Sequence, residues 1–493
     1  MLVQILLLLF GLLFLFFVIK PMITMIKLKL QFGSQCRIQY NIYGIFGLHT
    51  KFNLKNRWKK SEDQNVKFIV NNYSSRVQIT IIDPDYYKYV LINPENFSKI
   101  NDLNTNQLFD EGIMFQQGQK WKSQKELCSL HFDLKKLNSS ISTQNQIIQK
   151  HILQNDQQID QIQTTLLKIV NEIIIASFFG QDADKMQING KNIGIETIDL
   201  FQNLYKLMYK PYFIIKTILF GFQALKMFPN KQEQIIQTKI NNIKLLIEKI
   251  IQKRIVQHEL KLDEDENEIL QVSEDFLNIY IEAYLQSKKG ENKISLEEIK
   301  QQFFTFLYIG SNTTAQLIYS SLYYLAEYPE IQNELRQEIA NNCKEEINQS
   351  SELHCLVHLN AFFNEVLRLN QNVTIMRKVQ ITHYIKDLRL ERDWIVKVDP
   401  QVINCQKKYF DNPLEFNYKR WLQTQSIKEN NNFVFIPFSS GPKNCVGQDL
   451  VKIIYMLTIT KIMRNFMIIK NQKKINNLND QEITFVKQLI TQK

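Results

Sequence analysis

The segment of this sequence with the most specific chemistry lies near its C-terminal end. There, Phe438, Gly441, Cys445 and Gly447 fit the pattern F-x-x-G-x-x-x-C-x-G. From the numbers of Phe, Gly and Cys in the chain, such a match arises by chance in about 3 of 10,000 sequences. Glycines can adopt positive φ angles and let the backbone lie flat against a large planar ligand. Taken alone, the pattern fits either a metal-binding thiolate loop or a glycine turn beside an ordinary buried cysteine.

The residues that follow Cys445 favour a thiolate. The apolar run 446–466 is predicted to be a helix. The first turn of a helix carries a partial positive charge, which stabilises a nearby thiolate. A thiolate that ligates iron pushes electron density toward bound oxygen and favours O–O cleavage.

Two predicted helices upstream carry polar residues whose spacing predicts an ion pair in one case and a helix start in the other. Glu365 and Arg368 are three residues apart, so on a helix they share a face and can pair, although most pairs with this spacing are solvated. Ser295 and Glu298 fit a capping box that opens a helix predicted to run to about residue 327. A helix of roughly thirty residues crosses a whole domain.

The helix that opens at Ser295, the helix with Glu365 and Arg368, and the cysteine loop follow one another along the chain. In this order they resemble the cytochrome P-450 family, and the resemblance covers nearly the whole sequence. It implies a mainly α-helical fold with a small β region, formed by a single catalytic domain around a buried haem b. It also implies that Cys445 binds the haem iron as a thiolate. Phe438, Gly441 and Gly447 would then shape the loop that faces the haem.

A third part of the resemblance concerns the stretch 410–421, which is similar to the family's meander before the cysteine loop. The resemblance implies that Arg420 joins Glu365 and Arg368 in a network that locks the core behind the haem. The planar guanidinium of arginine suits such a network because it can bind a carboxylate at two points. The implied role is structural rather than catalytic.

The stretch 309–314 resembles the family's oxygen-activation motif. The resemblance implies that Gly310 leaves space beside the iron and that the Thr313 hydroxyl holds oxygen and helps to relay protons. The sequence departs from the family at Asn312, where an aspartate or glutamate is usual. An amide cannot exchange a proton near neutral pH as a carboxylate can. This departure puts the ordinary proton relay in question.

Four further residues are similar to those that bind the haem propionates in the family. Trp121 and Lys125 resemble the W-x-x-x-R segment, with lysine in place of arginine. Lys443 stands where Arg or His is common, and Arg377 follows the Glu365 helix at about the family distance. Lysine can neutralise a carboxylate but lacks the planar two-point contact of arginine.

The N-terminal segment 2–19 is apolar except for Gln4, and Lys20-Pro21 is predicted to end it. Its length is at the lower limit for spanning a bilayer. No basic residue precedes it and no small-x-small cleavage site follows it, so a signal anchor is favoured over a cleaved signal peptide. The basic residues that follow predict a cytosolic body. We therefore expect residues 1–20 to anchor a cytosolic catalytic domain, 21–493, to the endoplasmic reticulum membrane. The Pro-rich hinge that usually follows the family's anchor is missing.

The interior of the chain gives several weaker predictions. The stretch 76–82 alternates weakly and is predicted to be a strand, and 259–268 is predicted to be an acidic, solvated connector. The segment 211–228 fits either a pair of core helices or an amphipathic segment that dips into the membrane.

Charge and cysteine content exclude some classes of function. The net charge is +11, but the lysines are spread along the chain with no arginine-rich helix, so nucleic acid is not an expected partner. Six scattered cysteines predict a reducing compartment. His354, His358, Cys343 and Cys355 leave a zinc site as a weaker alternative.

The resemblance implies a monooxygenase that inserts one atom of O₂ into a small apolar substrate, such as a lipid, sterol, fatty acid or xenobiotic. Its electrons would come from NADPH through a flavoprotein reductase that binds at the membrane. Asn312 keeps a second interpretation open, in which the protein is a haem-thiolate isomerase, dehydratase or peroxygenase. A third is a haem-binding sensor or carrier without turnover.

Overall fold

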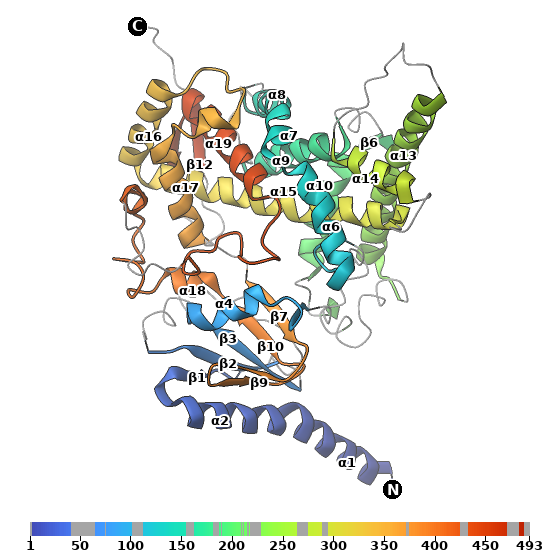
Figure 1. Cartoon of the computed structure of the whole chain (residues 1–493), viewed down its shortest axis with the longest axis vertical. Helices are drawn as coiled ribbons and strands as arrows, with labels where there is room; N and C mark the ends of the chain where they lie inside the picture. The colour runs from blue at the N-terminus through green and yellow to red at the C-terminus, as the bar shows by residue number, and fades with distance from the viewer. Residues whose placement is uncertain are drawn as a thin grey trace. The chain divides into compact units, whose positions relative to one another are not determined.

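The computed structural model describes residues 2–40, 65–73, 75–100, 112–153, 162–180, 187–188, 190–208, 210, 212–213, 216, 228–263, 275–287, 294–370, 374–423, 432–470 and 483–487. The chain divides into two compact units. Unit 1 comprises Met1–Ile100 and Ala361–Cys445, and unit 2 comprises Asn101–Asn360 and Val446–Lys493. Helices predominate and the β content is small, as the sequence predicts (Figure 1).

Unit 1 is built on a mixed sheet with the strand order β1-β2-β3-β10-β7-β4. The strands are β1 (Cys36–Ile38), β2 (Phe68–Tyr73), β3 (Arg76–Ile81), β10 (Ile395–Val398), β7 (Ile375–Val379) and β4 (Phe97–Lys99). β2 and β3 form an antiparallel hairpin, whereas β3 and β10, far apart in sequence, pair in parallel. The predicted strand at 76–82 is confirmed, with its end at Ile81.

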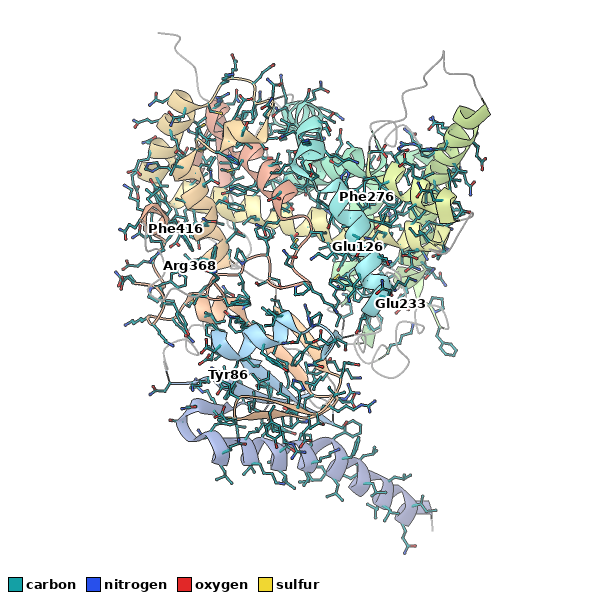
Figure 2. All side chains as sticks on the ribbon, viewed as in Figure 1. Tyr86, Glu126, Glu233, Phe276, Arg368 and Phe416 are labelled. Atoms are coloured by element: carbon teal, nitrogen blue, oxygen red, sulfur yellow. The ribbon has the colours of Figure 1, made fainter. Side chains whose placement is uncertain are left out.

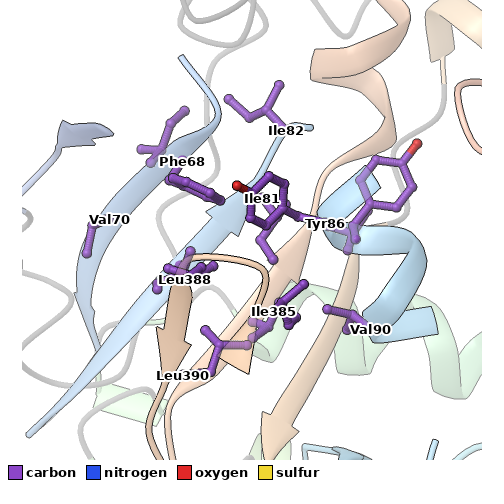
Figure 3. Close-up of a cluster of buried hydrophobic side chains, with 14 of the residues drawn as sticks. Phe68, Val70, Ile81, Ile82, Tyr86, Val90, Ile385, Leu388 and Leu390 are labelled. Atoms are coloured by element: carbon purple, nitrogen blue, oxygen red, sulfur yellow. The ribbon is translucent and has the colours of Figure 1, made fainter. Parts of the chain in front are cut away.

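The core of unit 1 lies between this sheet, helix α4 (Pro84–Ile92) and the hairpin β8 (His383–Ile385) with β9 (Leu388–Leu390). Asp83 caps α4 by accepting a hydrogen bond from the backbone N–H of Asp85 at 2.9 Å, and Pro84 suits the first turn of the helix. Figure 3 shows apolar side chains from these elements meeting, among them Phe68, Ile385 and Leu390. Two short helices complete the unit, α18 (Pro400–Asn404) and η6 (Tyr418–Leu422).

The helix that contains the apolar segment 2–19 continues past Lys20-Pro21. α1 (Leu2–Phe14) passes into a π-helical turn, η1 (Leu15–Ile19), and then into α2 (Lys20–Phe32). A proline inside a helix removes one N–H and crowds the preceding turn. The wider π turn accommodates this change, because the Lys20 N–H bonds the carbonyl of Leu15 and the helix continues.

Unit 2 is helical, with two short hairpins, β5 (Gln187–Ile188) with β6 (Lys191–Asn192) and β11 (Phe466–Lys470) with β12 (Ile483–Lys487). Its helices are α6 (Gly118–His131), α7 (Leu134–Ser139), α8 (Ile141–Leu153), α9 (Ile162–Phe179), α10 (Ile193–Met208), α13 (Lys231–Asp263), α14 (Phe276–Ser287), α15 (Leu296–Glu327), α16 (Pro329–Asn342) and α19 (Gln448–Asn465). The short helix η5 (Ser350–Leu353) follows α16. α17 (Val357–Asn370) begins in unit 2 and continues in unit 1.

The long central helix α15 agrees with the prediction at both ends. The Ser295 hydroxyl accepts a hydrogen bond from the Glu298 N–H at 3.0 Å, and the helix ends at Glu327, before Pro329 opens α16. α15 packs along α9, with Ile318 and Leu322 fully buried. α9 is long and apolar enough to cross a membrane, but more than half of it is buried inside unit 2.

Two other predicted elements differ from the structure. The acidic stretch expected at 259–268 is helical at its start, because α13 continues to Asp263 through residues with good helix propensity. The helix expected over 446–466 begins at Gln448, and Phe466 already belongs to β11. The segment 211–228, for which a membrane contact is one alternative, lies almost entirely outside the described residues.

Candidate functional site

The cysteine loop of unit 1 is held by its own backbone. The Cys445 N–H donates to the Phe438 carbonyl at 2.9 Å, and the Asn444 N–H donates to the Gly441 carbonyl at 3.1 Å. The Phe438 ring stacks on Phe363 of α17, with 6.5 Å between the ring centroids. Cys445 itself is exposed. The loop therefore presents a cysteine side chain from a fixed backbone.

The two glycines of the pattern have different reasons to be glycine. Gly441 has a φ of +75°, and a Cβ atom there would collide with the backbone of Leu91 at the end of α4. Gly447 is the N-cap of α19 with a φ of −90°, so it does not use the positive φ that a glycine allows. A Cβ atom at residue 447 would meet Phe132 at 3.7 Å, an ordinary contact. Only Gly441 is thus required by the backbone.

The Glu365–Arg368–Arg420 cluster is formed within unit 1. Arg368 binds Glu365 through two hydrogen bonds of 2.8 Å, from Nε to Oε2 and from Nη2 to Oε1. Nε of Arg420 donates to Oε1 of Glu365 at 3.2 Å. Glu365 and Arg368 have no exposed surface, and Figure 2 labels Arg368 inside the unit. The spacing that predicts a shared helix face therefore produces a buried two-point ion pair.

The cluster continues beyond the residues that the sequence singled out. The Glu365 carboxylate also accepts hydrogen bonds from the indole N–H of Trp421 and the backbone N–H of Asn417, each at 2.9 Å. Arg368 donates to the carbonyls of Asn404, Pro413 and Glu415 at 2.6–3.1 Å. Burial raises the pKa of Glu365, but Arg368 and Arg420 outweigh it and the net shift is downward.

A second group of positive charge lies nearer to the cysteine loop. Arg377 on β7 and Lys443 in the loop interact electrostatically, and both are partly buried. Burial lowers the pKa of Arg377 to about 10. Burial, together with the Arg377 charge, lowers the pKa of Lys443 to about 8, while Glu95 opposes this shift. Burial thus disfavours the charged forms of both side chains.

In unit 2, α6 brings together Trp121 and Lys125, which lie one helical turn apart. Trp121 is buried, and the amino group of Lys125 lies 5.8 Å from the centre of its ring, a distance typical of a cation–π contact. The lysine at residue 125 therefore places its amino group over the face of the indole ring.

The predicted oxygen-activation residues lie on α15. Asn312 and Thr313 are exposed, and both bond back to their own helix: Nδ2 of Asn312 to the Tyr308 carbonyl at 3.3 Å and Oγ1 of Thr313 to the Ile309 carbonyl at 2.9 Å. A Cβ atom at Gly310 would meet the side chain of Ile174 on α9 at 2.8 Å. A larger residue at position 310 would thus require the Ile174 side chain to shift, and the role of Gly310 beside the iron stays a prediction.

The C-terminal end of α6 carries a buried histidine that no sequence pattern identified. The His131 ring is 5% exposed and lies within an aromatic cluster, with centroid distances of 4.8 Å to Phe276 and 5.4 Å to Phe178. Figure 2 labels Phe276 in this part of unit 2. Burial, with a smaller contribution from Lys136, lowers the pKa of His131 to about 3. The ring is therefore neutral at physiological pH.

The residues of the zinc alternative do not form a metal site. Across the part of the chain that the structure describes, no three His, Cys, Asp or Glu side chains are grouped so that they could hold a metal ion. The Cys355 thiol instead donates to the carbonyls of Glu352 and Asn342, at 2.9 and 3.1 Å.

The sequence also matches a family of known proteins. The family model for cytochrome P450 matches residues 45–491. The chain is 23% identical to cytochrome P450 72A13 of Arabidopsis thaliana over 79% of this chain and 73% of that protein. It is 23% identical to cytochrome P450 3A13 of Mus musculus over 79% of this chain and 76% of that protein.

A solved structure has the same fold. Retinoic acid bound cyanobacterial CYP120A1 superposes with a TM-score of 0.67 at 18% identity, covering 84% of this chain and 88% of that one. The chain belongs to the cytochrome P450 family, which is a family of haem-thiolate monooxygenases with a cysteine-ligated haem iron.

Proposed function

We propose that Cys445 is the cysteine that ligates the iron of haem b. It is exposed and its backbone is fixed by the hydrogen bond to Phe438. It is also the cysteine that stands in the F-x-x-G-x-x-x-C-x-G pattern. When bound, the haem would supply the activation of dioxygen that the family's chemistry requires.

The residues around the loop fit a haem because haem brings two propionate carboxylates. Burial lowers the pKa of Arg377 and of Lys443, and the Arg377 charge adds to the shift of Lys443, so a carboxylate beside them would stabilise their charged forms. Lys125, held over Trp121, offers a further positive charge. We assign Arg377, Lys443, Lys125 and Trp121 to propionate binding. The Glu365–Arg368–Arg420 cluster is already filled by its own hydrogen bonds, so we assign it a structural role.

Side chains on α15 would take part in proton transfer. The Thr313 hydroxyl, which donates to the Ile309 carbonyl, can accept a hydrogen bond from a water molecule. Thr313 can thus hold that water in place, but Asn312 cannot recharge it with a proton as a carboxylate does. Water from the solvent must therefore supply the proton, and we propose that the relay is weakened rather than absent.

We propose that the reaction inserts one oxygen atom of O₂ into a small apolar molecule such as a lipid, sterol, fatty acid or xenobiotic. NADPH would provide the electrons through a flavoprotein reductase at the membrane. The apolar side chains of α1 and the adjoining η1 are largely exposed, from Leu7 to Phe16, which supports an anchor within residues 1–20 and a catalytic body over 21–493. Basic residues after the anchor favour a cytosolic body on the endoplasmic reticulum.

The observation that carries this proposal is the fixed, exposed Cys445. In the Cys445→Ser variant, the red-shifted band that a thiolate ligand gives the ferrous CO adduct should disappear. The Cys355→Ser variant, which changes the other exposed cysteine, should keep the band. If Cys445→Ser keeps it too, the assignment is wrong.

Asn312 favours a second candidate function, that of a haem-thiolate isomerase, dehydratase or peroxygenase that needs no dioxygen. Oxygen uptake by the purified protein with reductase, NADPH and a substrate chosen by its spectral shift separates the two. A monooxygenase consumes O₂ and NADPH together. The alternative forms product without O₂.

A further inference from the structure

Two cysteines of unit 2 lie in the connection between α16 and α17. Cys343 is the C-cap of α16, and Cys355 lies between η5 and α17. Cys355 is exposed and Cys343 is partly buried. Three other cysteines are buried, namely Cys36, Cys128 and Cys405. Outside the cysteine loop, the connection between α16 and α17 therefore holds the cysteines that a reagent in solution can reach.

The Cys355 sulfur lies beside the peptide group that joins Asn342 to Cys343. It is 3.1 Å from the carbonyl oxygen of Asn342. Because that oxygen belongs to the peptide group before Cys343, the Cα atom of Cys343 is within about 6 Å of the Cys355 sulfur. A disulfide joins cysteines whose Cα atoms are about 4.4–6.8 Å apart, so side-chain rotation and a small adjustment of the loop can join these two.

The two thiols also interact electrostatically. Burial raises the pKa of the Cys343 thiol, the Arg464 charge opposes this shift, and the neighbouring Cys355 adds to it. The Cys355 thiol donates to the carbonyls of Glu352 and Asn342, and an S–H group is a weak donor. The Cys355 side chain can therefore turn toward Cys343 at little cost.

The loop between the two cysteines is held at both ends. At its start, Arg464 of α19 donates to the carbonyls of Cys343 and Glu345, each at 2.7 Å. At its end, the Glu338 carboxylate on α16 accepts a hydrogen bond from the backbone N–H of His358 at 2.6 Å. These bonds hold the two ends of the loop near each other, and each thiol therefore meets the other at a high effective concentration.

We infer that Cys343 and Cys355 form a reversible dithiol–disulfide site that reacts with a small disulfide such as oxidised glutathione. The exposed Cys355 reacts first: its thiolate attacks one sulfur of oxidised glutathione, forms a mixed disulfide and releases a glutathione thiolate, which takes up the proton that Cys355 lost. The Cys343 sulfur then attacks the Cys355 sulfur, and the second glutathione leaves with the proton of Cys343. Two cysteine thiols are thereby oxidised to one disulfide, and one oxidised glutathione is reduced to two thiols.

The test is incubation of the full-length, haem-loaded protein with oxidised glutathione, followed by alkylation of free thiols and mass spectrometry of non-reduced peptides. The parent protein should yield a linked peptide pair that contains Cys343 and Cys355, and an excess of reduced glutathione should remove the link. Cys343→Ser should instead accumulate the mixed disulfide of Cys355 with glutathione, several-fold above the parent. Cys355→Ser should form no link and several-fold less mixed disulfide than Cys343→Ser, because Cys343 is partly buried.

Urea unfolding gives a second measurement. The oxidised parent should unfold at a higher urea concentration than the reduced parent, because the disulfide closes the loop 343–355 and restricts the unfolded chain. Neither serine variant should show this difference between oxidised and reduced samples.

Three results overturn the inference. A glutathione adduct that persists on Cys355 of the parent, with no linked peptide, shows that Cys343 does not resolve it. A link that survives excess reduced glutathione is a permanent structural disulfide instead of a reversible site. The absence of any reaction at either cysteine shows that the two thiols are not accessible to a small disulfide.

Discussion

Unit 1 contains two groups of positively charged side chains, and the two groups differ in how these charges are balanced. In the first, Glu365 accepts hydrogen bonds from both arginines, from Trp421 and from a backbone N–H, and its pKa is lowered. In the second, Arg377 and Lys443 carry like charges, and the pKa values of both cations are lowered. The first favours the charged forms that it contains, whereas the second penalises them.

This difference separates a structural cluster from a binding site. A buried ion pair whose hydrogen bonds are satisfied has nothing to offer a ligand, and removing one partner is costly. A pair of like charges is costly to hold, and an anionic ligand lowers that cost. Arginine therefore belongs to a buried ion pair at residue 368, whereas at residue 377 we propose that it binds a ligand.

The largest effect is expected at Glu365. The Glu365→Gln variant keeps the shape of the side chain but leaves two buried arginines without their counter-charge, which costs about 3–5 kcal/mol of unfolding free energy. Urea unfolding of the purified variant measures it. The control is Glu415→Gln, which makes the same chemical change on an exposed side chain of the neighbouring loop. Equal stability of the two variants would contradict the structural role of the cluster.

The second effect is expected at the like-charge pair. Arg377→Met and Lys443→Met should each weaken haem retention by roughly 10- to 100-fold, the range of one lost charged hydrogen bond. The unfolding free energy of the haem-free protein should stay the same or rise, because a repulsive pair is removed. Transfer of haem to an apoprotein acceptor measures retention, with Lys419→Met as an exposed control. A loss of stability without a loss of haem would make this pair structural as well.

A third buried ionisable group extends the comparison to pH. The pKa of His131 is about 3 in the folded chain and 6.5 for an unburied histidine. Below pH 6.5 the unfolded histidine takes up a proton that the folded one refuses, so stability is complete above pH 6.5 and falls as the pH drops toward 3. At pH 5 the loss is about 2 kcal/mol.

The His131→Phe variant should lose this part of the pH dependence. Urea unfolding at pH 7 and pH 5 measures the slope, which matters more than the absolute stability because the new ring also changes packing. His354→Phe, at an exposed histidine, should behave as the parent protein does. An unchanged slope in His131→Phe would show that burial does not hold this ring neutral.

The smallest effect is expected at Asn312. Asn312→Asp places a carboxylate where the side chain is exposed, so little stability should be lost. The product formed per NADPH consumed should rise by a small factor, well below the ~100-fold of a fully positioned acid or base, because solvent water already supplies protons. A variant that binds haem but couples no better would refute the weakened relay and favour the reaction without O₂.

The sequence predicted those features that depend on local spacing. The three-residue separation of Glu365 and Arg368 is enough to place them together on a helix, and the capping pattern located the start of α15. The strand at Arg76–Ile81 and the family resemblance are confirmed as well. Arg420, more than fifty residues from Glu365, came only from the resemblance.

The features that the sequence did not reveal depend on the backbone or on distant packing. Trp421 and Asn417 reach Glu365 because the loop before η6 turns back on α17, and no local pattern encodes that turn. The one signal in the sequence was the position of Trp421 directly after Arg420, a residue already implied to contact Glu365. The continuation of the helix through Lys20-Pro21 was not predicted, because a π turn that accommodates a proline has no simple sequence signature.

The packing of α2 also sets how this protein can be shortened. Phe32 contacts Phe68, and Phe68 in turn packs against Tyr86 of α4, so α2 closes one side of the apolar core. A soluble form made by removing everything before β1 would expose these rings and should aggregate. A form that begins at Lys20 keeps the core closed and gives up only α1 and η1. The chain needed to fold therefore begins within the same continuous helix that carries the proposed anchor.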